Sequence, residues 1–227
     1  VQVHPDDSNA PAGKRGKSEA WYILAADQGA TIITGVDGPI QIDQIREQVV
    51  ETAVAAGEVY LVPAGTVHAI GAGVLLYEIQ QASDVTWRLY DWGRPRDLHI
   101  DEALAAARPE QQATRIEPCR VSEGVEMLVA CRYFALQRWH VAGERSLPAC
   151  PETFRVLTVL DGDLLLGDVR MRRGSSTLLP ADLPDQTLRG DGSLLLGFIP
   201  DLDADVREPL RAAGHDVESI RRLGTEL

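Results

Sequence analysis

Residues 57–68 constrain the fold of this chain more than any other segment. Their sequence, GEVYLVPAGTVH, places the short apolar run 59–62 directly before a Pro63-Ala64-Gly65 turn and a single histidine, His68. Proline presets its own φ and glycine tolerates positive φ, so a sharp reversal of the chain is expected here. The pattern predicts a strand that ends in a turn, and the turn fixes the position of the His68 imidazole.

Three further side chains with metal-ligating atoms precede this segment. Gln2 and His4 flank an apolar residue, and Glu19 begins the apolar run 19–24. Residues i and i+2 of a strand share a face, so Gln2 and His4 are expected to point the same way. With His68, the set comprises two imidazoles, a carboxylate and an amide oxygen. Such a set suits Zn²⁺ with an open coordination position, and it also suits Mn, Fe, Co or Ni.

The composition is that of an ordinary globular chain with a strong negative charge. Of its 227 residues, 44% are hydrophobic and 25% are charged, and the net charge is −12. This charge disfavours general binding to nucleic acid or an anionic membrane, although a local metal and a few arginines still allow a small anionic substrate. The sequence contains no long apolar run, no signal peptide and no Cys-x-x-Cys pattern. We therefore expect a cytoplasmic protein with reduced thiols and with no nucleic acid or membrane partner.

Short apolar runs separated by Gly, Pro and Asp dominate the chain. This spacing predicts a mostly β protein built as barrels or sandwiches. Helices are expected at 42–52, at 101–107, where Asp101 and Glu102 occupy the first turn, and in the tail after Pro200. The expected strands lie at 21–24, 30–34, 59–62, 74–80, 134–139, 154–160, 164–166, 176–179 and 193–198.

A second part of the chain repeats the first without its histidine. Residues 174–182 (GSSTLLPAD) reproduce residues 57–65 (GEVYLVPAG), and Asp185 falls where His68 would stand. His140 lies in a different frame and is interpreted as an ordinary strand residue. We predict a metal-binding domain at 1–108, a linker at 109–127, a degenerate second domain at 128–202 and a helical tail at 203–227. Because a binding strand is rarely the first element of a protein, we also expect residues upstream of Gln2.

Four motifs in a fixed order resemble one enzyme family. They are QVHPDD at 2–7, GKSEAWY at 16–22, PAGTVHAIG at 63–71 and EIQQASDVTWRLYDWG at 78–93. The chain is similar to the type I mannose-6-phosphate isomerases, particularly the short bacterial form, densely over 1–108 and more loosely over 128–202. The resemblance implies a double cupin, two small antiparallel β-barrels or jelly rolls with a few short helices. It also implies a zinc-dependent aldose–ketose isomerase that interconverts mannose 6-phosphate and fructose 6-phosphate.

The resemblance also implies roles for individual residues. Gln2, His4, Glu19 and His68 match the family's zinc ligands. The base that transfers the proton is left open between Glu78, Asp84, Lys17 and His4. Lys17, Glu78, Asp84 and Arg88 fall on the family's active-site positions, and Arg94 falls on a basic position suited to the substrate phosphate.

Two other functions stay open. Cupins with a His/His/carboxylate site also host Fe(II) oxygenases, and a cupin can bind a sugar or sugar phosphate without catalysis. Carboxylates and Arg88 beside the site favour phospho-sugar chemistry, whereas an apolar pocket would favour the oxygenase. The expected partner is a small sugar phosphate, and the expected cofactor is Zn²⁺ or another divalent transition metal.

Overall fold

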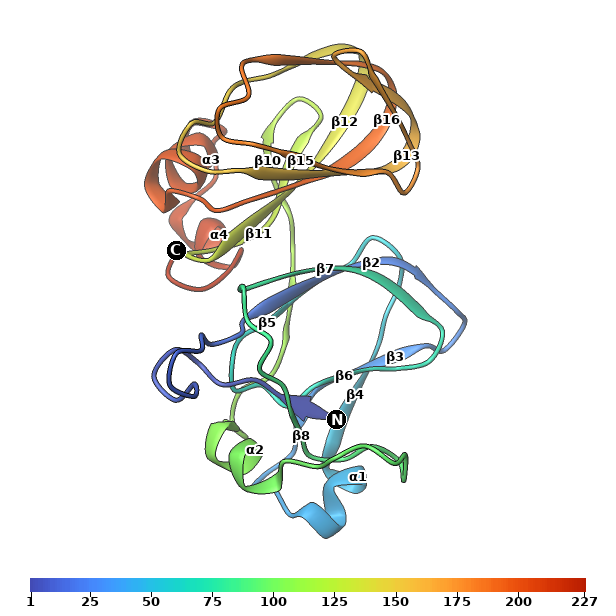
Figure 1. Ribbon diagram of the computed structural model, residues 1–227, viewed down its shortest axis with the longest axis vertical. Helices are drawn as coiled ribbons and strands as arrows, with labels where there is room; N and C mark the ends of the chain where they lie inside the picture. Colours follow the sequence, from blue (N-terminus) through green and yellow to red (C-terminus); the bar gives the residue numbers. More distant parts are fainter. The chain divides into compact units, whose positions relative to one another are not determined.

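The computed structural model describes residues 1–227, which divide into two compact units. The first unit comprises Val1–Ile116 and the second Glu117–Leu227 (Figure 1). Each unit contains its own clusters of buried hydrophobic side chains. The architecture is mostly β, as the apolar runs predicted, and no helix has the length and apolar character needed to span a membrane.

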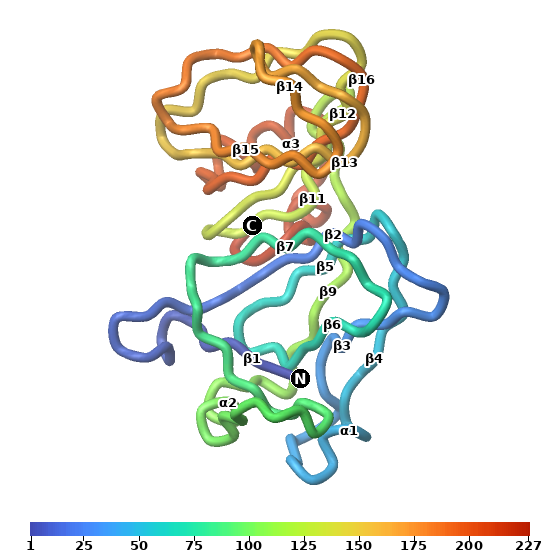
Figure 2. The backbone as a smooth tube through the Cα atoms, turned by 45° about the vertical axis from the view of Figure 1, so that its right-hand side comes forward, coloured from blue at the N-terminus to red at the C-terminus, as the bar shows by residue number.

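Nine strands build the first unit. They are β1 (Gln2–Val3), β2 (Glu19–Ala26), β3 (Thr31–Val36), β4 (Val49–Ala53), β5 (Val59–Val62), β6 (Ala69–Ile70), β7 (Val74–Gln80), β8 (Trp87–Arg88) and β9 (Thr114–Ile116). One sheet has the order β7-β2-β5-β9, a second has the order β4-β3-β6, and β1 pairs with β8 alone. The two larger sheets lie on opposite sides of the unit (Figures 1 and 2). Ile32 of β3 packs against Trp21 and Tyr60 of the other sheet, so the core lies between them.

The turn that the sequence singled out carries the chain from one sheet to the other. β5 pairs with β2 and β9, whereas β6, which follows the turn, pairs with β3. Gly65 has a φ of +91°, in the left-handed region that favours glycine. Pro63 has no N–H to continue a ladder, so strand pairing is interrupted where the chain changes sheets.

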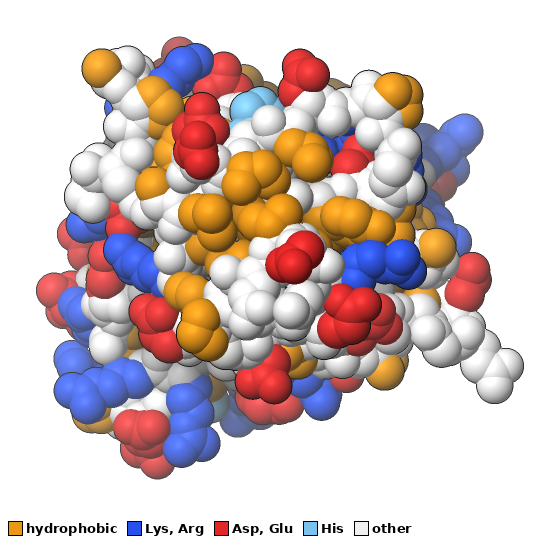
Figure 3. Space-filling view, turned by 90° about the horizontal axis from the view of Figure 1, so that it is seen from below, with side chains coloured by type: hydrophobic (Ala, Val, Ile, Leu, Met, Phe, Trp, Pro, Cys, Tyr) orange, Lys and Arg blue, Asp and Glu red, His pale blue; other side chains and the backbone are white.

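Short helices close one end of the first unit. They are the 3₁₀ turn η1 (Ile42–Gln44), α1 (Ile45–Gln48) and α2 (Ile100–Ala106). Ile45 and Ala103 are buried in a core cluster with Val3 of β1. Hydrophobic side chains also gather on the outer surface of this end, ringed by charged ones (Figure 3). Exposed hydrophobic residues of α2 and of the loop before it include Leu104 and Leu98.

Seven strands form a single sheet in the second unit. They are β10 (Cys119–Ser122), β11 (Val125–Cys131), β12 (Phe134–Leu147), β13 (Arg155–Leu166), β14 (Val169–Arg172), β15 (Ser176–Leu179) and β16 (Gln186–Phe198). The order is β10-β11-β12-β16-β13-β14, and β15 also pairs with β13. Strand pairing closes no sheet of either unit on itself, so the closed barrels expected from the sequence are not found.

The tail folds against its own unit. It contains the π-helical segment η2 (Leu202–Arg207), α3 (Glu208–Ala212) and α4 (Val217–Arg221). The apolar residues at helical spacing explain why, because Val206, Leu210 and Ile220 are buried. Val217, which belongs to the same pattern, is exposed.

Two parts of the chain form different elements from those expected. The helix expected at 42–52 ends at Gln48, and Val49 and Val50 instead begin β4, where they pair with Val36 and Gly35. β-Branched side chains favour a strand when a partner edge is available. The runs 154–160 and 164–166 form one strand, β13, because the register shift between Val159 and Asp161 lets pairing continue through the intervening turn-like residues.

Candidate metal centre

Three strand ends bring His4, Glu19 and His68 together. His4 follows β1, Glu19 is the first residue of β2, and His68 follows the turn after β5. Backbone hydrogen bonds fix the two histidine segments to each other. The N–H of Gln2 donates to the carbonyl of His68 (3.0 Å), and the N–H of His68 donates to the carbonyl of Gln2 (2.9 Å). The N–H of Gly65 donates to the carbonyl of His4 (2.8 Å), which anchors the turn beside the site.

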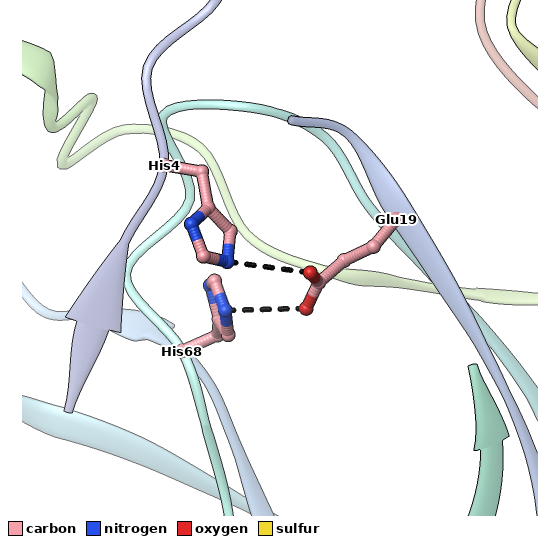
Figure 4. Close-up of side chains that lie close together, drawn as sticks. All are labelled: His4, Glu19 and His68. Carbon is pink, nitrogen blue, oxygen red and sulfur yellow. Dashed lines mark ion pairs between the residues drawn. The ribbon is translucent and has the colours of Figure 1, made fainter. Parts of the chain in front are cut away.

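Both imidazoles face the Glu19 carboxylate (Figure 4). His4 Nε2 lies 3.3 Å from Glu19 Oε2, and His68 Nε2 lies 3.2 Å from Glu19 Oε1. One ligand atom from each of the three residues lies within 4.8 Å of the other two. None of the three residues exceeds 1% exposure, so all three side chains are buried.

The tautomer of each histidine follows from its second ring nitrogen. Nδ1–H of His4 donates to the carbonyl of Val85 (2.9 Å), and Nδ1–H of His68 donates to the carbonyl of Thr66 (2.8 Å). With Nδ1 protonated, a neutral imidazole presents the lone pair of Nε2 to the cluster. This is the arrangement in which protein carbonyls orient metal-ligating histidines.

Two buried atoms of the cluster are left without a hydrogen bond. His4 Nε2 and Glu19 Oε2 have no hydrogen-bond partner, although they lie close to each other. An unsatisfied buried polar group costs roughly 1–3 kcal/mol, and more if it is charged. A divalent cation bound between these atoms would remove that cost, and two imidazole nitrogens with a carboxylate are ligands that zinc and similar metals accept. The residues therefore fit a metal site.

The electrostatics of the cluster favour an ionised Glu19 and a neutral His4. Burial alone would raise the pKa of Glu19, but the His68 and His4 imidazoles outweigh it and hold that pKa well below its usual range. Burial lowers the pKa of His4, partly offset by Glu19. Both shifts favour the protonation states that bind a cation.

Gln2 lies next to the cluster, as its strand position predicted. Its Nε2 is 3.1 Å from His68 Nε2. Rotation of the amide by 180° would present Oε1 to the same point. Gln2 is therefore within reach of a fourth position.

Lys17 and Trp21 lie on the same strand face as Glu19. Lys17 Nζ is 3.4 Å from Glu19 Oε2, and its side chain is only 11% exposed. The indole N–H of Trp21 donates to Glu19 Oε1 (3.1 Å). Trp21 also packs its ring edge-on against His68, with centroids 5.6 Å apart. These contacts orient the carboxylate and leave one ammonium at the edge of the cluster.

Glu78 stands opposite Trp21 in the pairing of β7 with β2. Directly opposed residues share a face of the sheet, so Glu78 is on the face that carries Glu19. Partial burial of the carboxyl and the negative charge of Glu19 raise the pKa of Glu78, although the residue as a whole is exposed. A raised pKa makes a carboxylate a stronger base than an ordinary glutamate.

Asp84, one of the candidates for the proton-transfer base, forms an ion pair at the surface. Its carboxylate accepts hydrogen bonds from Lys14 Nζ (2.9 and 2.8 Å). The imidazole of His4 is oriented by the carbonyl of the next residue, Val85. Asp84 lines an open pocket of about 430 Å³ with Lys14, Arg15 and Ser83.

Of the two candidate arginines, only Arg88 is placed next to the ligand strands. It pairs with Gln2 in the β1–β8 ladder, and its Nη1 donates to the carbonyl of Asp97 (2.9 Å). Arg94 is exposed, and its nearest acidic partner is Asp91, at 3.9 Å.

Sequence reasoning missed the groups that orient the ligands. Trp21 has a sequence signal, because it stands two residues from Glu19 and thus on the same face of the strand. The carbonyls of Thr66 and Val85 have none, since every residue carries a carbonyl and only the folded backbone selects these two.

Comparison with known proteins gives consistent findings. Residues 124–199 match the family model described as mannose-6-phosphate isomerase, cupin domain. The chain is 31% identical over 214 residues to a mannose-6-phosphate isomerase of Streptococcus mutans, which covers 84% of this chain and 67% of that protein. It is 32% identical over 224 residues to a mannose-6-phosphate isomerase of Bacillus subtilis, covering 88% of this chain and 70% of the relative.

A solved structure is also similar. The crystal structure of the mannose 6-phosphate isomerase from Bacillus subtilis matches with a TM-score of 0.76 and 31% sequence identity, covering 87% of this chain and 70% of that chain. The match extends over most of both units, so the similarity is not confined to the strands around the metal cluster.

Proposed function

Because this chain belongs to the mannose-6-phosphate isomerase family, we propose that its first unit catalyses the metal-dependent interconversion of mannose 6-phosphate and fructose 6-phosphate. Its mostly β architecture is a cupin fold. The observation that carries the proposal is the buried His4–Glu19–His68 cluster with its two unpartnered ligand atoms. The reaction is inferred from the relatives, and the metal site is inferred from the cluster.

His4, Glu19 and His68 would hold the metal, with Gln2 as the fourth ligand. When bound, a divalent ion such as Zn²⁺ supplies Lewis acidity that polarises the sugar oxygens. Lys17, at the edge of the cluster, donates a hydrogen bond to an oxygen on which negative charge develops. Because its ammonium is almost buried, that charge is stabilised more strongly than it would be in water.

Glu78 is the group we assign to proton transfer between C1 and C2. Its carboxylate removes the proton from C2 of the aldose, while the C1 carbonyl oxygen gains a proton from the Lys17 ammonium and the C1–C2 double bond of an enediol forms. The same carboxyl then returns the proton to C1 as the hydroxyl on C2 gives its proton back to Lys17 and becomes the carbonyl. His4 is committed to the cluster through both ring nitrogens, and Asp84 is paired with Lys14, so neither is free for this role. The raised pKa of Glu78 supports the assignment.

Arg88 and Arg94 are proposed to bind the anionic part of the substrate. Arg88 faces Gln2 across the β1–β8 ladder, which puts a guanidinium on the side of the strand that carries a candidate ligand. A planar guanidinium matches the oxygens of a phosphate. Arg94 is exposed and has only a distant acidic neighbour, so it is available to a phosphate from solvent.

We propose that the second unit is a second, degenerate cupin domain. The family match at 124–199 lies in this unit, and the repeat at 174–182 includes β15. The domain limits 1–108, 109–127, 128–202 and 203–227 remain our proposal. Residues 114–116 of the proposed linker pair with β5 of the first unit as β9.

The test is a coupled assay of fructose 6-phosphate production from mannose 6-phosphate. The protein is assayed as purified, after treatment with a chelator, and after addition of Zn²⁺. We expect turnover that the chelator abolishes and a divalent metal restores. Turnover that survives complete removal of metal would overturn the proposed mechanism.

A parallel measurement of metal content separates two causes of inactivity. Protein that binds metal and mannose 6-phosphate without turnover would be a sugar-phosphate-binding cupin. Protein that binds metal but not the sugar phosphate would have a different substrate, for which the oxygenase class is the first to examine.

A further inference from the structure

The two units share a strand register that identifies equivalent positions. In the first unit, Glu19 of β2 pairs with Val62, the last residue of β5 before Pro63. In the second unit, Arg155 of β13 pairs with Leu179, the last residue of β15 before Pro180. Val62 and Leu179 are equivalent positions of the repeated segments 57–65 and 174–182. Arg155 therefore occupies the position of the ligand Glu19, and the charge at this position is reversed.

Arg155 is a buried arginine without a carboxylate partner. Only 9% of the residue is exposed, and its single hydrogen bond runs from Nη2 to the carbonyl of Pro148 (2.6 Å). The buried polar atoms that lack a partner are confined to His4 and Glu19. The remaining N–H groups of Arg155 thus reach solvent and are free to donate. Partial loss of hydration on burial lowers the pKa of Arg155.

A second donor lies on the same face of the sheet. Gln137 of β12 and Leu157 of β13 both pair with Leu196 of β16, while Arg155 pairs with Phe198. Paired residues share a face, and residues two apart along a strand share it as well, so Gln137 and Arg155 point to the same side. Gln137 is 9% exposed, and its Oε1 accepts a hydrogen bond from the indole of Trp139 (2.8 Å). That bond leaves its amide N–H₂ group without a partner.

We propose that Arg155 and Gln137 form a binding site for a small oxyanion, such as a phosphate or a carboxylate, in the second unit. A guanidinium fork and an amide N–H₂ group are donors without acceptor capacity on the open side, which suits an oxyanion and excludes a metal cation. A largely buried guanidinium with no carboxylate partner is stabilised when an anion binds to its free N–H groups. The site is separate from the proposed isomerase centre, whose ligands all belong to the first unit.

The aspartate that aligns with His68 does not already fill this role. Asp185, which aligns with His68 in the repeat, is exposed and accepts a hydrogen bond from the N–H of Ala149 (2.8 Å). It forms no ion pair with Arg155, since no salt bridge joins them. The segment 148–149 is thus held from both sides, by Arg155 through one carbonyl and by Asp185 through the next N–H.

Two indole groups make the proposal testable in the intact chain. Trp139 Nε1 is bonded to Gln137 in the second unit, and Trp21 Nε1 is bonded to Glu19 in the first. The ¹⁵N–¹H signals of these indoles, assigned with Trp139→Phe and Trp21→Phe, are followed while inorganic phosphate or acetate is added at constant ionic strength. We expect the Trp139 signal to move saturably with an apparent Kd of about 1 mM for at least one anion.

Matched arginine variants identify the group responsible. Arg155→Gln should weaken the effect on Trp139 at least about 10-fold and leave any response of Trp21 unchanged, because the guanidinium supplies the charge-assisted bonds. Arg173→Gln removes the same charge from an exposed position of the second unit and should leave the titration intact. Arg155→Lys keeps the positive charge but loses the paired N–H donors of the guanidinium, and it should bind the anion more weakly than the native chain. It serves as a second variant if Arg155→Gln does not fold.

Three outcomes would overturn the proposal. One is a Trp139 signal that does not respond to either anion up to about 20 mM, far above the affinity expected of an arginine-centred site. Another is an equal response in folded Arg155→Gln. The third is a response of Trp21 alone, which would assign anion binding to the first unit and leave Arg155 as a structural donor to Pro148. Isomerase turnover in Arg155→Gln should be unchanged, so failure of this proposal is separable from failure of the proposed function.

Discussion

At the residue scale, His68 connects the turn, the cluster and the ladder. Its backbone pairs with Gln2, its Nδ1 is bonded to the Thr66 carbonyl, and its Nε2 faces Glu19. An imidazole held at three points is presented in a single orientation. The geometry of the cluster thus depends on the Pro63–Gly65 turn as much as on the ligand itself.

His68→Ala should remove the metal and the turnover together. The substitution removes one of the three clustered ligand side chains. Changes in residues that merely support a ligand typically lower metal affinity roughly 10–100-fold, and we expect a larger loss here. The measurement is zinc per chain after dialysis, by atomic emission. His140→Ala, which changes an exposed histidine of the second unit, is the control and should keep full occupancy. Full occupancy in His68→Ala would remove this residue from the ligand set.

Arg88→Ala should separate binding of metal from catalysis. Arg88 faces Gln2 but is not part of the clustered triad, so metal content should remain at the native level. Loss of a donor to the phosphate or to developing charge should reduce kcat/KM at least about 100-fold. The measurement is kcat/KM from steady-state kinetics on metal-loaded protein. Unchanged kinetics would give Arg88 a structural role through its bond to Asp97.

The residues of the site were predictable to different degrees. Gln2, His4, Glu19 and His68 could be predicted to converge because a spacing of two places residues on one strand face and a proline–glycine turn fixes a third strand end. The partner of Asp84 could not be predicted, because Lys14 lies 70 positions away and an exposed ion pair leaves no periodic trace. The role of Arg155 also required the register, since the sequence repeat alone pointed to Asp185 as the altered position.

At the scale of elements, strand pairing determines whether a segment becomes helix or strand where local sequence preference does not. Residues 42–52 show helical spacing, yet Val49–Ala53 pairs with β3 because an unpaired edge of the three-stranded sheet is beside it. The strands at 59–62, 74–80 and 176–179 were predicted with the observed limits. Glycine precedes each apolar run, and proline follows the first and the third. The long strands β12, β13 and β16 extend past their apolar runs because their polar halves pair with one another.

Two neighbouring leucines of β15 should differ in how much they contribute to stability. Leu179 is 2% exposed and lies in the core of the second unit, whereas Leu178 is 62% exposed. Leu179→Ala should lower the free energy of unfolding by about 2–5 kcal/mol, and Leu178→Ala by no more than about 0.5 kcal/mol. Urea unfolding followed by circular dichroism measures both. Equal losses would show that β15 is shifted by one residue, because such a slip exchanges the two faces.

Gly16 should be required for close packing of the loop that carries Lys17. A Cβ placed on Gly16 would lie 2.5 Å from the backbone carbon of Asp6, so the backbone must move. Gly16→Ala should therefore displace Lys17 and reduce kcat/KM by at least about 10-fold, a cost of about 1.4 kcal/mol in the transition state. Ala12→Ser adds one atom to an exposed residue of the same loop and should have no effect. Native kinetics in Gly16→Ala would show that Lys17 tolerates the shift.

At the scale of the whole molecule, the two units carry related registers with opposite charge at one position. Glu19 gives the first unit a site for a cation, and Arg155 removes that option from the second. The difference between the two units depends on the Glu19/Arg155 position and on His68, whose equivalent in the repeat is Asp185. A chain with two similar sheets can thus place its metal chemistry in one unit and keep the other for packing or for a different ligand.

Removal of the metal should therefore loosen the first unit selectively. All three clustered ligands belong to Val1–Ile116, and without a cation His4 Nε2 and Glu19 Oε2 are buried without a hydrogen-bond partner. A ligand at about 100 times its Kd stabilises the folded state by roughly 2.7 kcal/mol, and local opening around the site becomes more frequent when this contribution is lost. Hydrogen exchange measured by mass spectrometry should show faster exchange after chelation in peptides from β1, β2 and the β5–β6 turn. Peptides from 117–227 should exchange at the same rate with and without metal. His68→Ala should show no response to the chelator, and equal changes in both units would contradict a metal site confined to the first.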